Sequence, residues 1–398
     1  MTATDPADSP SSSSSAPDVA GADWQHDRVS TNDGVAIPVR ATARRPAWDR
    51  LPAEARRAIR SAAGCEVLSG WSAGTGFTPG FASRLELADG SRVFVKAASS
   101  ADDALHGWAL SDAYREEARK LLLLPEVGSP RLLWHHDVQI GSERWMILGF
   151  EYVDGAPPRR PWRRHQLQLV LDKLAAIAPV LADPPAELGL ARFSDDFADY
   201  PDWIASARTR AGDGGWLQTV EALAGESVER CAGNSCQHLD LRDDNILIDA
   251  AEDVWICDWN SVSRAAPWID LVCVLLSARG DGHDCDAILA AHPLTREVDP
   301  RSVDALLALL WLYFSDRRQQ PVPPHSPHLR DHQTWYAEVT RGWLAERLSL
   351  GAAVSTLDSS AATHRATPSK PQTNAPAQHP SEATGHETPS KSQTNPDG

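Results

Sequence analysis

Three polar side chains that suit a metal and proton-transfer site lie within the stretch Cys236–Ser261: Asp240, Asn245 and Asp258. The apolar runs "NILI" and "VWIC", separated by "DAAED", predict a β-hairpin with a short polar loop. Because a hairpin brings its outer ends together, we expect the amide of Asn245 and the carboxylate of Asp258 to lie side by side. Hard oxygen ligands of this kind suit Mg²⁺, which uses few protein ligands alongside substrate phosphates. Asp240 lies on the loop that enters the hairpin, where a base that orients a substrate hydroxyl is expected.

The residues around Asp240 match the pattern H-x-D-L-x-x-x-N, which protein kinases carry in their catalytic loop. Its fixed positions are His238, Asp240, Leu241 and Asn245. Asp258 opens the tripeptide "DWN", at the place where protein kinases have D-F-G. The alternative interpretation is an acidic turn beside a hairpin, and it leaves unexplained the ordered partners that occur upstream.

Those upstream partners are a lysine on a strand and a glutamate on the next helix. Lys96 ends the run "RVFVK" and resembles the strand lysine that holds the phosphates of ATP in kinases. In "YREEARKLLLL", Glu117 shares a helix face with Leu121 and Leu124, whereas Glu116 points away from that face. We therefore prefer Glu117 as the partner of Lys96. A single lysine on a strand is usually a solvated surface residue. The position of Lys96 in the chain, before the glutamate and the catalytic loop, favours a functional role instead.

Two further stretches could contact a nucleotide through the backbone. The turn "SAGTGFTPGFASR" contains Gly74, Gly76 and Gly80, whose N–H groups could approach phosphates. It is not a clean G-x-G-x-x-G motif, and a merely flexible turn explains it equally well. The segment "MILGFEYVDG" resembles a kinase hinge, in which the backbone from Glu151 to Val153 would bond the edge of adenine.

Taken together, these motifs resemble the aminoglycoside phosphotransferase/choline kinase group of protein-kinase-like small-molecule kinases. The stretch "HLDLRDDNILI" is similar to the H-G-D-x-x-x-x-N loop of that family, and "ICDWNSVSRAAPWIDL" to its metal-binding segment. The resemblance covers roughly residues 60–345 and is strongest at 236–272. Leu239 stands where the family often has Gly. The fold implied is α+β and bilobal, with a small β-rich N-lobe and a larger α-helical C-lobe.

The resemblance also implies roles for the residues. Asp240 would orient the acceptor hydroxyl, and Asn245 and Asp258 would hold Mg²⁺. Lys96 and Glu117 would hold the phosphates of ATP.

Two more residues take structural roles by the same likeness. His238 would brace the catalytic loop, and Asp270 in "PWIDL" would anchor that loop from the following helix. The chain has no A-P-E motif and no obvious activation segment between Asp258 and Asp270. This argues for a small-molecule acceptor rather than a peptide.

The elements that must position these residues follow from hydrophobic periodicity and turn signals. The stretch Pro46–Gly64 predicts a helix that ends at its glycine. The alternation in "ASRLELADGSRVFVKAA", with Asp89-Gly90 between two runs, predicts a hairpin, and "RLLWHHDV" with "ERWMILGFEYV" predicts a second strand pair. Between them, "DDALHGWALSDAYREEARKLLLL" is helical, and from Pro157 onward most of the periodicity is helical.

This pattern divides the chain into a disordered N-terminal tail, a nucleotide-binding N-lobe, a hinge, a C-lobe with the catalytic loop, metal and acceptor sites, and a disordered low-complexity tail. The predicted bounds are 1–31, 32–150, 151–156, 157–351 and 352–398. Both tails are rich in Ser and Pro, and "TPSKPQTN" recurs as "TPSKSQTN". Such segments cannot bury enough apolar surface to offset the entropy lost on ordering.

Composition narrows the class of partner. The formal net charge of −16 argues against nucleic-acid binding, which depends on Lys and Arg, and leans mildly toward a cationic acceptor. Six scattered cysteines without a CxxC pair suggest a reducing cytoplasm, and no apolar run reaches membrane-spanning length. We therefore expect a cytoplasmic protein with no membrane or nucleic-acid partner. The oligomeric state does not follow from the sequence.

Three local features allow more than one interpretation. The acidic stretch "FSDDFADYPDW" could line a pocket for a polycationic acceptor, although a solvated helix entry is favoured. The basic stretch "RRPWRRH" indicates a solvated face after the hinge, or a site for an anionic acceptor. Tryptophans such as Trp203 could stack on rings, but core packing is the safer interpretation for most of them.

The sequence therefore predicts an enzyme that moves the γ-phosphoryl group of ATP to a hydroxyl of a small molecule. The acceptor is an aminoglycoside-type antibiotic, or a metabolite such as an amino alcohol or a sugar. A non-catalytic ATP-binding protein on the same fold is the alternative from a different class. The presence of Lys96, Asp240, Asn245 and Asp258 speaks against it, since such proteins usually lack one of these groups.

Overall fold

The computed structural model describes residues 28–40, 42–102, 109–210 and 214–363. The chain divides into two units, Met1–Ser349 and Leu350–Gly398, and every residue predicted for the site belongs to the first. No helix in the described part of the chain is long and apolar enough to cross a membrane. All six cysteines are free thiols.

A five-stranded antiparallel sheet forms the small lobe, with strand order β3-β4-β5-β7-β6. The strands are β3 (Val67–Ser72), β4 (Phe81–Leu87), β5 (Arg92–Ser99), β6 (Leu132–Ile140) and β7 (Glu143–Glu151). Strands β4 and β5 pair directly, as do β6 and β7, so the structure confirms both predicted strand pairs. Strand β5 then pairs with β7, which joins the two hairpins into one sheet.

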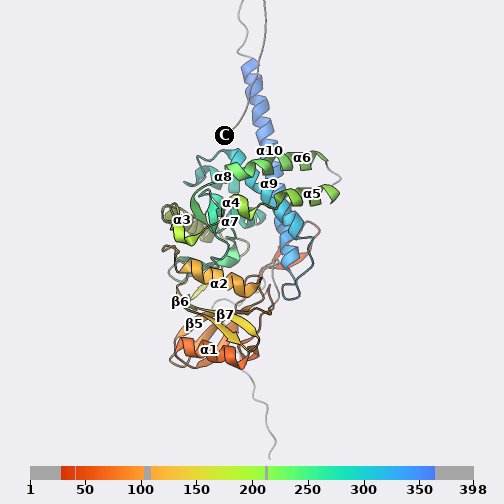
Figure 1. Ribbon diagram of the computed structural model, residues 1–398. Helices are drawn as coiled ribbons and strands as arrows, with labels where there is room; N and C mark the ends of the chain where they lie inside the picture. Colours follow the sequence, from red (N-terminus) through yellow and green to blue (C-terminus); the bar gives the residue numbers. More distant parts are fainter. Residues whose placement is uncertain (1–27, 41, 103–108, 211–213, 364–398) are drawn as a thin grey trace, which may run out of the picture. The chain divides into compact units, whose positions relative to one another are not determined.

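Two helices cover opposite faces of this sheet, α1 (Ala53–Ala63) and α2 (Leu110–Leu121) (Figure 1). Alternate residues of β7 point to opposite faces, so Ile147 packs in the core with α1 whereas Leu148 packs in the core with α2. This two-sided burial holds strand β5, which carries Lys96, in the middle of the lobe.

The predicted bounds of the two helices need adjustment. Helix α1 ends at Gly64, whose φ of 68° makes it the left-handed cap that the sequence predicted. The predicted start at Pro46 is wrong, because Pro52 is the N-cap and a separate 3₁₀ turn, η2 (Trp48–Arg50), precedes it. Helix α2 begins at Leu110, and residues 103–108 of its predicted span lie outside the described residues.

The large lobe is mainly helical and contains two small sheets. The predicted hairpin is confirmed: β10 (Ile246–Asp249) pairs antiparallel with β11 (Val254–Ile256), and β8 (Gly155–Ala156) adds a third strand. A second sheet pairs β9 (Ser235–Gln237) with β12 (Ser263–Ala265). The remaining elements are α3 (Arg164–Leu181), η3 (Ala186–Leu188), α4 (Phe193–Asp196), α5 (Tyr200–Arg210), α6 (Gly214–Arg230), η4 (Asp243–Asn245), α7 (Ile269–Gly280), α8 (Cys285–Ala291), α9 (Pro300–Arg317) and α10 (Leu329–Thr363).

The first described residues belong to the large lobe. Strands β1 (Arg28–Ser30) and β2 (Ala36–Pro38) pair with each other, and Val29, Ile37 and Val39 are buried in the core of the helical lobe. The prediction that the N-lobe starts at residue 32 is therefore wrong. From these strands the chain crosses to the small lobe through the described residues 40 and 42–45, which we call the N-terminal strap.

The predicted tails are also shorter than expected where the structure describes them. Residues 28–30 form β1 inside the predicted disordered segment 1–31, because Val29 is buried. Helix α10 continues to Thr363, inside the predicted segment 352–398. Residues 1–27 and 364–398 lie outside the described residues. The fold class is confirmed as α+β with a small sheet lobe and a larger helical lobe, and a hinge at 151–156 stays a prediction.

Candidate active site

The hairpin brings Asp240, Asn245 and Asp258 into one place. Ile246 pairs with Ile256, and the Cys257 N–H donates to the Asn245 carbonyl at 2.8 Å, so the two ends of the hairpin meet. The Asn245 side-chain Nδ2 donates to the Asp240 carbonyl at 2.8 Å and lies 3.4 Å from the Asp240 Oδ2. With its NH₂ group used in this way, the Asn245 side-chain oxygen remains available as a ligand.

A three-membered charge cluster joins the small lobe to this hairpin. The Lys96 Nζ lies 2.7 Å from Glu117 Oε1, 3.0 Å from Glu117 Oε2 and 3.0 Å from Asp258 Oδ1. Glu116 instead pairs with Arg119 on the outer side of α2, so Glu117 is the partner of Lys96.

Burial changes the pKa values of the residues in this cluster. Burial disfavours the charged form of Lys96, but the negative charges of Asp258 and Glu117 outweigh this effect and raise the pKa of the lysine. Burial raises the pKa of Glu117 to about 7, although Lys96 acts against that shift. Two carboxylates facing one ammonium leave an excess of negative charge at this point of the site.

The catalytic loop has a left-handed residue that a carboxylate holds in place. Leu239 has a φ of 61°, which costs an L-residue about 1–2 kcal/mol relative to ordinary backbone. The buried Asp270 at the start of α7 accepts the His238 N–H at 2.7 Å and the Leu239 N–H at 2.9 Å. The anchoring carboxylate thus holds the loop in a conformation that glycine would adopt more easily.

His238 ties the same loop to the end of β11. Its Nε2 lies 2.8 Å from the Cys257 carbonyl, and its ring meets Trp259 edge to face at 5.0 Å between centroids. The side chain is fully buried and does not line the cavity, as expected of a brace. Asp258, next to these two residues, also has a positive φ of 68°. Non-glycine residues at positive φ occur often at functional sites.

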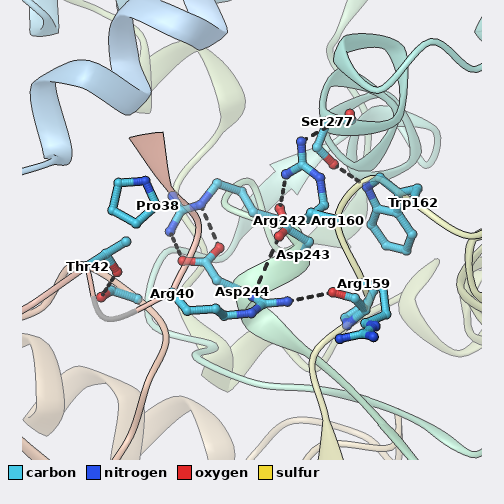
Figure 2. A network of polar contacts seen from close by, with 12 residues as sticks. Pro38, Arg40, Thr42, Arg159, Arg160, Trp162, Arg242, Asp243, Asp244 and Ser277 are labelled. Atoms are coloured by element: carbon cyan, nitrogen blue, oxygen red, sulfur yellow. Dashed lines mark hydrogen bonds and ion pairs between the residues drawn. The ribbon is translucent and has the colours of Figure 1, made fainter. Parts of the chain in front are cut away.

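Sequence reasoning missed Arg242, which contacts Asp240 directly. Its Nη1 touches Asp240 Oδ1. Its Nε and Nη2 bond both oxygens of Asp244 at 2.9 and 3.1 Å, as Figure 2 shows. Burial raises the pKa of Asp240, and the Arg242 charge acts against that rise. A basic residue two positions after the aspartate, flanked by acidic residues in "DLRDDN", is the signal that could have revealed it.

A buried ionic network supports the loop from behind. Asp243 pairs with Arg160 at 3.0 Å and with Arg40 of the N-terminal strap at 3.8 Å (Figure 2). Arg160 also bonds Asp281 at 2.6 Å. The predicted solvated face in "RRPWRRH" is therefore wrong for Arg160 and Trp162, which are both buried. Their burial follows from partners that lie more than 80 positions away in the chain.

The glycine-containing turn is fastened to its surroundings by polar contacts. Thr42 Oγ1 donates to the Gly76 carbonyl at 2.7 Å, and Arg45 Nη1 donates to the Ala73 carbonyl at 2.9 Å. Gly76 needs its positive φ of 79°. At Gly80 a side chain would meet Leu110 Cδ2 at 2.7 Å, so this glycine permits close packing on α2 and does not line the cavity.

Arg45 is a second residue that sequence reasoning missed. It lines the cavity beneath the turn, and its Nε has no hydrogen-bond partner among the described residues. Burial lowers the pKa of its guanidinium, while the charges of Asp258 and Asp244 act in the opposite direction. Its position on the strap gives no sequence signal, since the strap reaches the site through tertiary folding.

One cavity of about 2070 Å³ contains most of the predicted site residues. Its lining includes Gly76, Lys96, Glu117, Glu151, Val153, Asp240, Asn245 and Asp258, whereas His238, Asp270 and Gly80 lie outside it. At the predicted hinge, the Glu151 N–H donates to the Arg131 carbonyl at 3.0 Å and is not free for a ligand. The Val153 N–H has no hydrogen-bond partner among the described residues.

Comparison with known proteins gives matches among solved structures. No model of a known protein family and no curated protein matches the chain. A microcompartment-associated aminopropanol kinase is 15% identical over 74% of this chain and 97% of its own, with a TM-score of 0.51. A spectinomycin phosphotransferase is 12% identical, over 74% and 98% of the two chains, with a TM-score of 0.49. A choline kinase from Streptococcus pneumoniae is 15% identical, over 75% and 99%, with a TM-score of 0.46.

The first of these structures shows the fold. The chain has the bilobal protein-kinase-like fold of that aminopropanol kinase, with the antiparallel sheet in one lobe and the helices in the other.

Proposed function

We propose that this protein is an ATP-dependent kinase that phosphorylates a hydroxyl group of a small molecule. The observation that carries the proposal is one cavity in which Lys96, Glu117 and Asp258 form a charge cluster and Asp240 lies beside Asn245. Phosphoryl transfer needs positioning and charge neutralisation more than covalent chemistry, and this arrangement supplies both.

The nucleotide would bind with its adenine at the predicted hinge and its phosphates near Lys96. The unpaired Val153 N–H supports a hinge contact, and the charged Lys96 ammonium supports a phosphate contact. Arg45 adds a guanidinium as a second cation, and the charges of Asp258 and Asp244 act on it. Because Arg bonds phosphate oxygens well, Arg45 supports binding of a triphosphate rather than a nucleoside.

The residues present fit a magnesium ion. Asn245 and Asp258 offer an amide oxygen and a carboxylate at adjoining ends of the hairpin, and the cluster around Lys96 has excess negative charge. The described residues contain no group of three or more His, Cys, Asp or Glu suited to a metal. Two oxygen ligands suit Mg²⁺, which keeps several waters and binds substrate phosphates. When bound, the ion would neutralise charge on the transferred phosphoryl group.

Asp240 would orient the acceptor and receive its proton. In the transfer, the acceptor oxygen bonds to the γ-phosphorus, the bond from that phosphorus to the bridging oxygen breaks, and ADP leaves with the electron pair. Arg242 supports the ionised form of Asp240, which is the form that can accept the hydroxyl proton.

A small acceptor agrees with the short segment after Asp258. Residues 263–265 of that segment form β12, which pairs with β9 beside the catalytic loop. An activation segment that binds peptide substrates has no length to form there. An aminoglycoside-type antibiotic, an amino alcohol and a sugar all belong to the proposed class, and membership of the aminoglycoside phosphotransferase/choline kinase family is part of the same proposal.

Phosphotransfer with Mg·ATP and a panel of aminoglycosides, amino alcohols, sugars and hydroxy acids tests the proposal, with mass spectrometry of the acceptors as the readout. Asp240→Asn should abolish product while keeping Mg·ATP binding, measured by calorimetry. Asp183→Asn, which changes an exposed carboxylate outside the cavity, should behave as the wild type. A wild-type protein that binds no Mg·ATP would end the proposal. ATP binding without product from any acceptor would favour the non-catalytic alternative.

A further inference from the structure

Aromatic side chains line the part of the cavity that adjoins Asp240. Tyr313 and Phe314 of α9 and Tyr336 of α10 belong to this lining. The rings of Phe314 and Tyr336 stack at 5.0 Å with an angle of 17° between their planes. Tyr313 and Asp240 line the same cavity, and burial together with the charge of Asp240 raises the pKa of the Tyr313 hydroxyl.

Arg317, the last residue of α9, lines this part of the cavity and lacks a carboxylate partner. Its guanidinium carbon lies 5.4 Å from the ring centre of Tyr313 and 5.8 Å from that of Trp203. It forms no ion pair with any described residue, and its Nε is buried without a hydrogen-bond partner there. The Tyr313 hydroxyl can accept one N–H of Arg317, but the Trp203 ring offers no oxygen, and the buried Nε of Arg317 stays without an acceptor among the described residues.

The neighbouring cations have partners. Arg242, which lines the same cavity, bonds Asp240 and Asp244, and Arg330, which lies outside the lining, bonds the Pro321 carbonyl and the Gln333 amide. A buried donor without an acceptor costs free energy, and an anionic ligand that supplies the acceptor recovers it. The unsatisfied group on this side of the cavity is therefore a cation.

The acidic stretch "FSDDFADYPDW" does not form a pocket for a polycationic acceptor. Of Asp195, Asp196, Asp199 and Asp202, Asp196 alone lines the cavity. Its carboxylate accepts the Ser263 hydroxyl, and Lys120 acts on it from nearby. This acidic stretch therefore gives no support to a polycationic acceptor.

We infer that the acceptor carries an anionic oxygen group, a carboxylate or a phosphate, which Arg317 binds while the aromatic rings contact the apolar part of the molecule. This inference rests on the proposed function, since Asp240 marks the hydroxyl end of the same ligand. It narrows the acceptor class to acidic hydroxyl compounds and disfavours polycationic aminoglycosides.

Binding of four aromatic probes of matched size to the protein loaded with magnesium and a non-hydrolysable ATP analogue tests the inference. The probes are hydroxyphenylpropanoate, hydroxybenzylphosphonate, hydroxyphenylpropanamide and tyramine, and calorimetry measures their affinities. We expect the two anions to bind about tenfold or more tightly than the amide and the amine, because each gains charge-assisted hydrogen bonds from Arg317. The tighter of the two anions identifies the group on the natural acceptor.

Two variants separate the contact from a general charge effect. Arg317→Gln should remove the preference for anions while keeping the affinity for the ATP analogue, which also reports that the variant is folded. Arg318→Gln changes the next residue, which does not line the cavity, and should keep the preference. Tyramine binding as tightly as the anions, no binding by either anion, or an unchanged preference in Arg317→Gln would overturn the inference. Failure of the ATP analogue to bind the wild type would instead overturn the proposed function.

Discussion

Replacing Asp270 with Asn tests how the catalytic loop is held. Both carboxylate oxygens accept backbone N–H groups, from His238 at 2.7 Å and from Leu239 at 2.9 Å. In Asp270→Asn, the amide keeps one acceptor oxygen and turns its NH₂ group toward the second backbone N–H. One hydrogen bond is therefore lost, and the other becomes a bond between neutral groups.

The expected cost follows from these two bonds. A hydrogen bond to a charged group contributes about 1.5–3 kcal/mol and a neutral one about 1 kcal/mol, so replacing two charged bonds by one neutral bond costs the loop about 2–5 kcal/mol of anchoring. Burial raises the pKa of Asp270, which means that burying its charge is costly, and a neutral amide recovers part of that cost. We therefore expect the free energy of unfolding to fall by about 2 kcal/mol.

Activity should fall more than nucleotide binding. Leu239, with its φ of 61°, relaxes when its N–H loses the carboxylate, and Asp240 moves with it. A small displacement of a positioning group is expected to lower kcat by about tenfold or more. Lys96 and Glu117 are untouched, so the affinity for Mg·ATP should stay near the wild-type value.

Urea unfolding, calorimetry with Mg·ATP and initial rates of phosphotransfer measure the three quantities. Asp284→Asn is the matched control, since Asp284 accepts one backbone N–H from Ala287 as the N-cap of α8, and Asn caps equally well. The control should change stability by less than about 0.5 kcal/mol. An Asp270→Asn variant with wild-type stability and wild-type kcat would refute the anchoring argument.

Three further changes give independent tests. Arg45→Gln should weaken Mg·ATP binding about tenfold and leave adenosine binding unchanged, because the guanidinium would contact the phosphates. Calorimetry measures both affinities, and an equal loss for the two ligands would contradict this. Burial lowers the pKa of His332 to about 4, below the ordinary histidine value of 6.5. Between these two pH values the unfolded chain binds more protons than the folded one, so the free energy of unfolding falls as pH drops from about 6.5 to about 4. His332→Gln keeps an N–H donor and should flatten this part of the stability profile measured by urea unfolding, whereas an equal decline in both proteins would argue against it. Gly80→Ala should lower the unfolding free energy by about 1–3 kcal/mol, because its methyl group meets Leu110 at 2.7 Å, while Gly214→Ala, with open space around it, should cost far less.

The residues nearest the proposed chemistry were predictable because their signal is local. The hairpin of β10 and β11 follows from two apolar runs around a polar loop, and its pairing brings Asn245 and Asp258 together without any distant contact. Glu117 could be preferred over Glu116 from helical periodicity, because the inward face of α2 is marked by its leucines.

The residues that support the site were not predictable, because their signal is not local. Arg40 and Arg45 lie on the strap, about 200 positions before the catalytic loop, and no local pattern marks them as neighbours of Asp243 and Asp258. Arg160 was expected in solvent because its neighbours in sequence are basic. Its burial depends on Asp243 and Asp281, whose charges compensate for its own.

The amino-acid sequence alone determined the fold class, the hairpin and the order of the lysine, glutamate, aspartate and asparagine. Hydrophobic periodicity and turn preferences depend on a few neighbouring residues, so they can be recognised without knowledge of the rest of the chain. Tertiary structure decided which charges have partners around the site: Asp243 gained Arg160 and Arg40, and Arg317 was left without a carboxylate among the described residues. Pairing of buried charges depends on distances between distant segments, and those distances exist only after the lobes have packed.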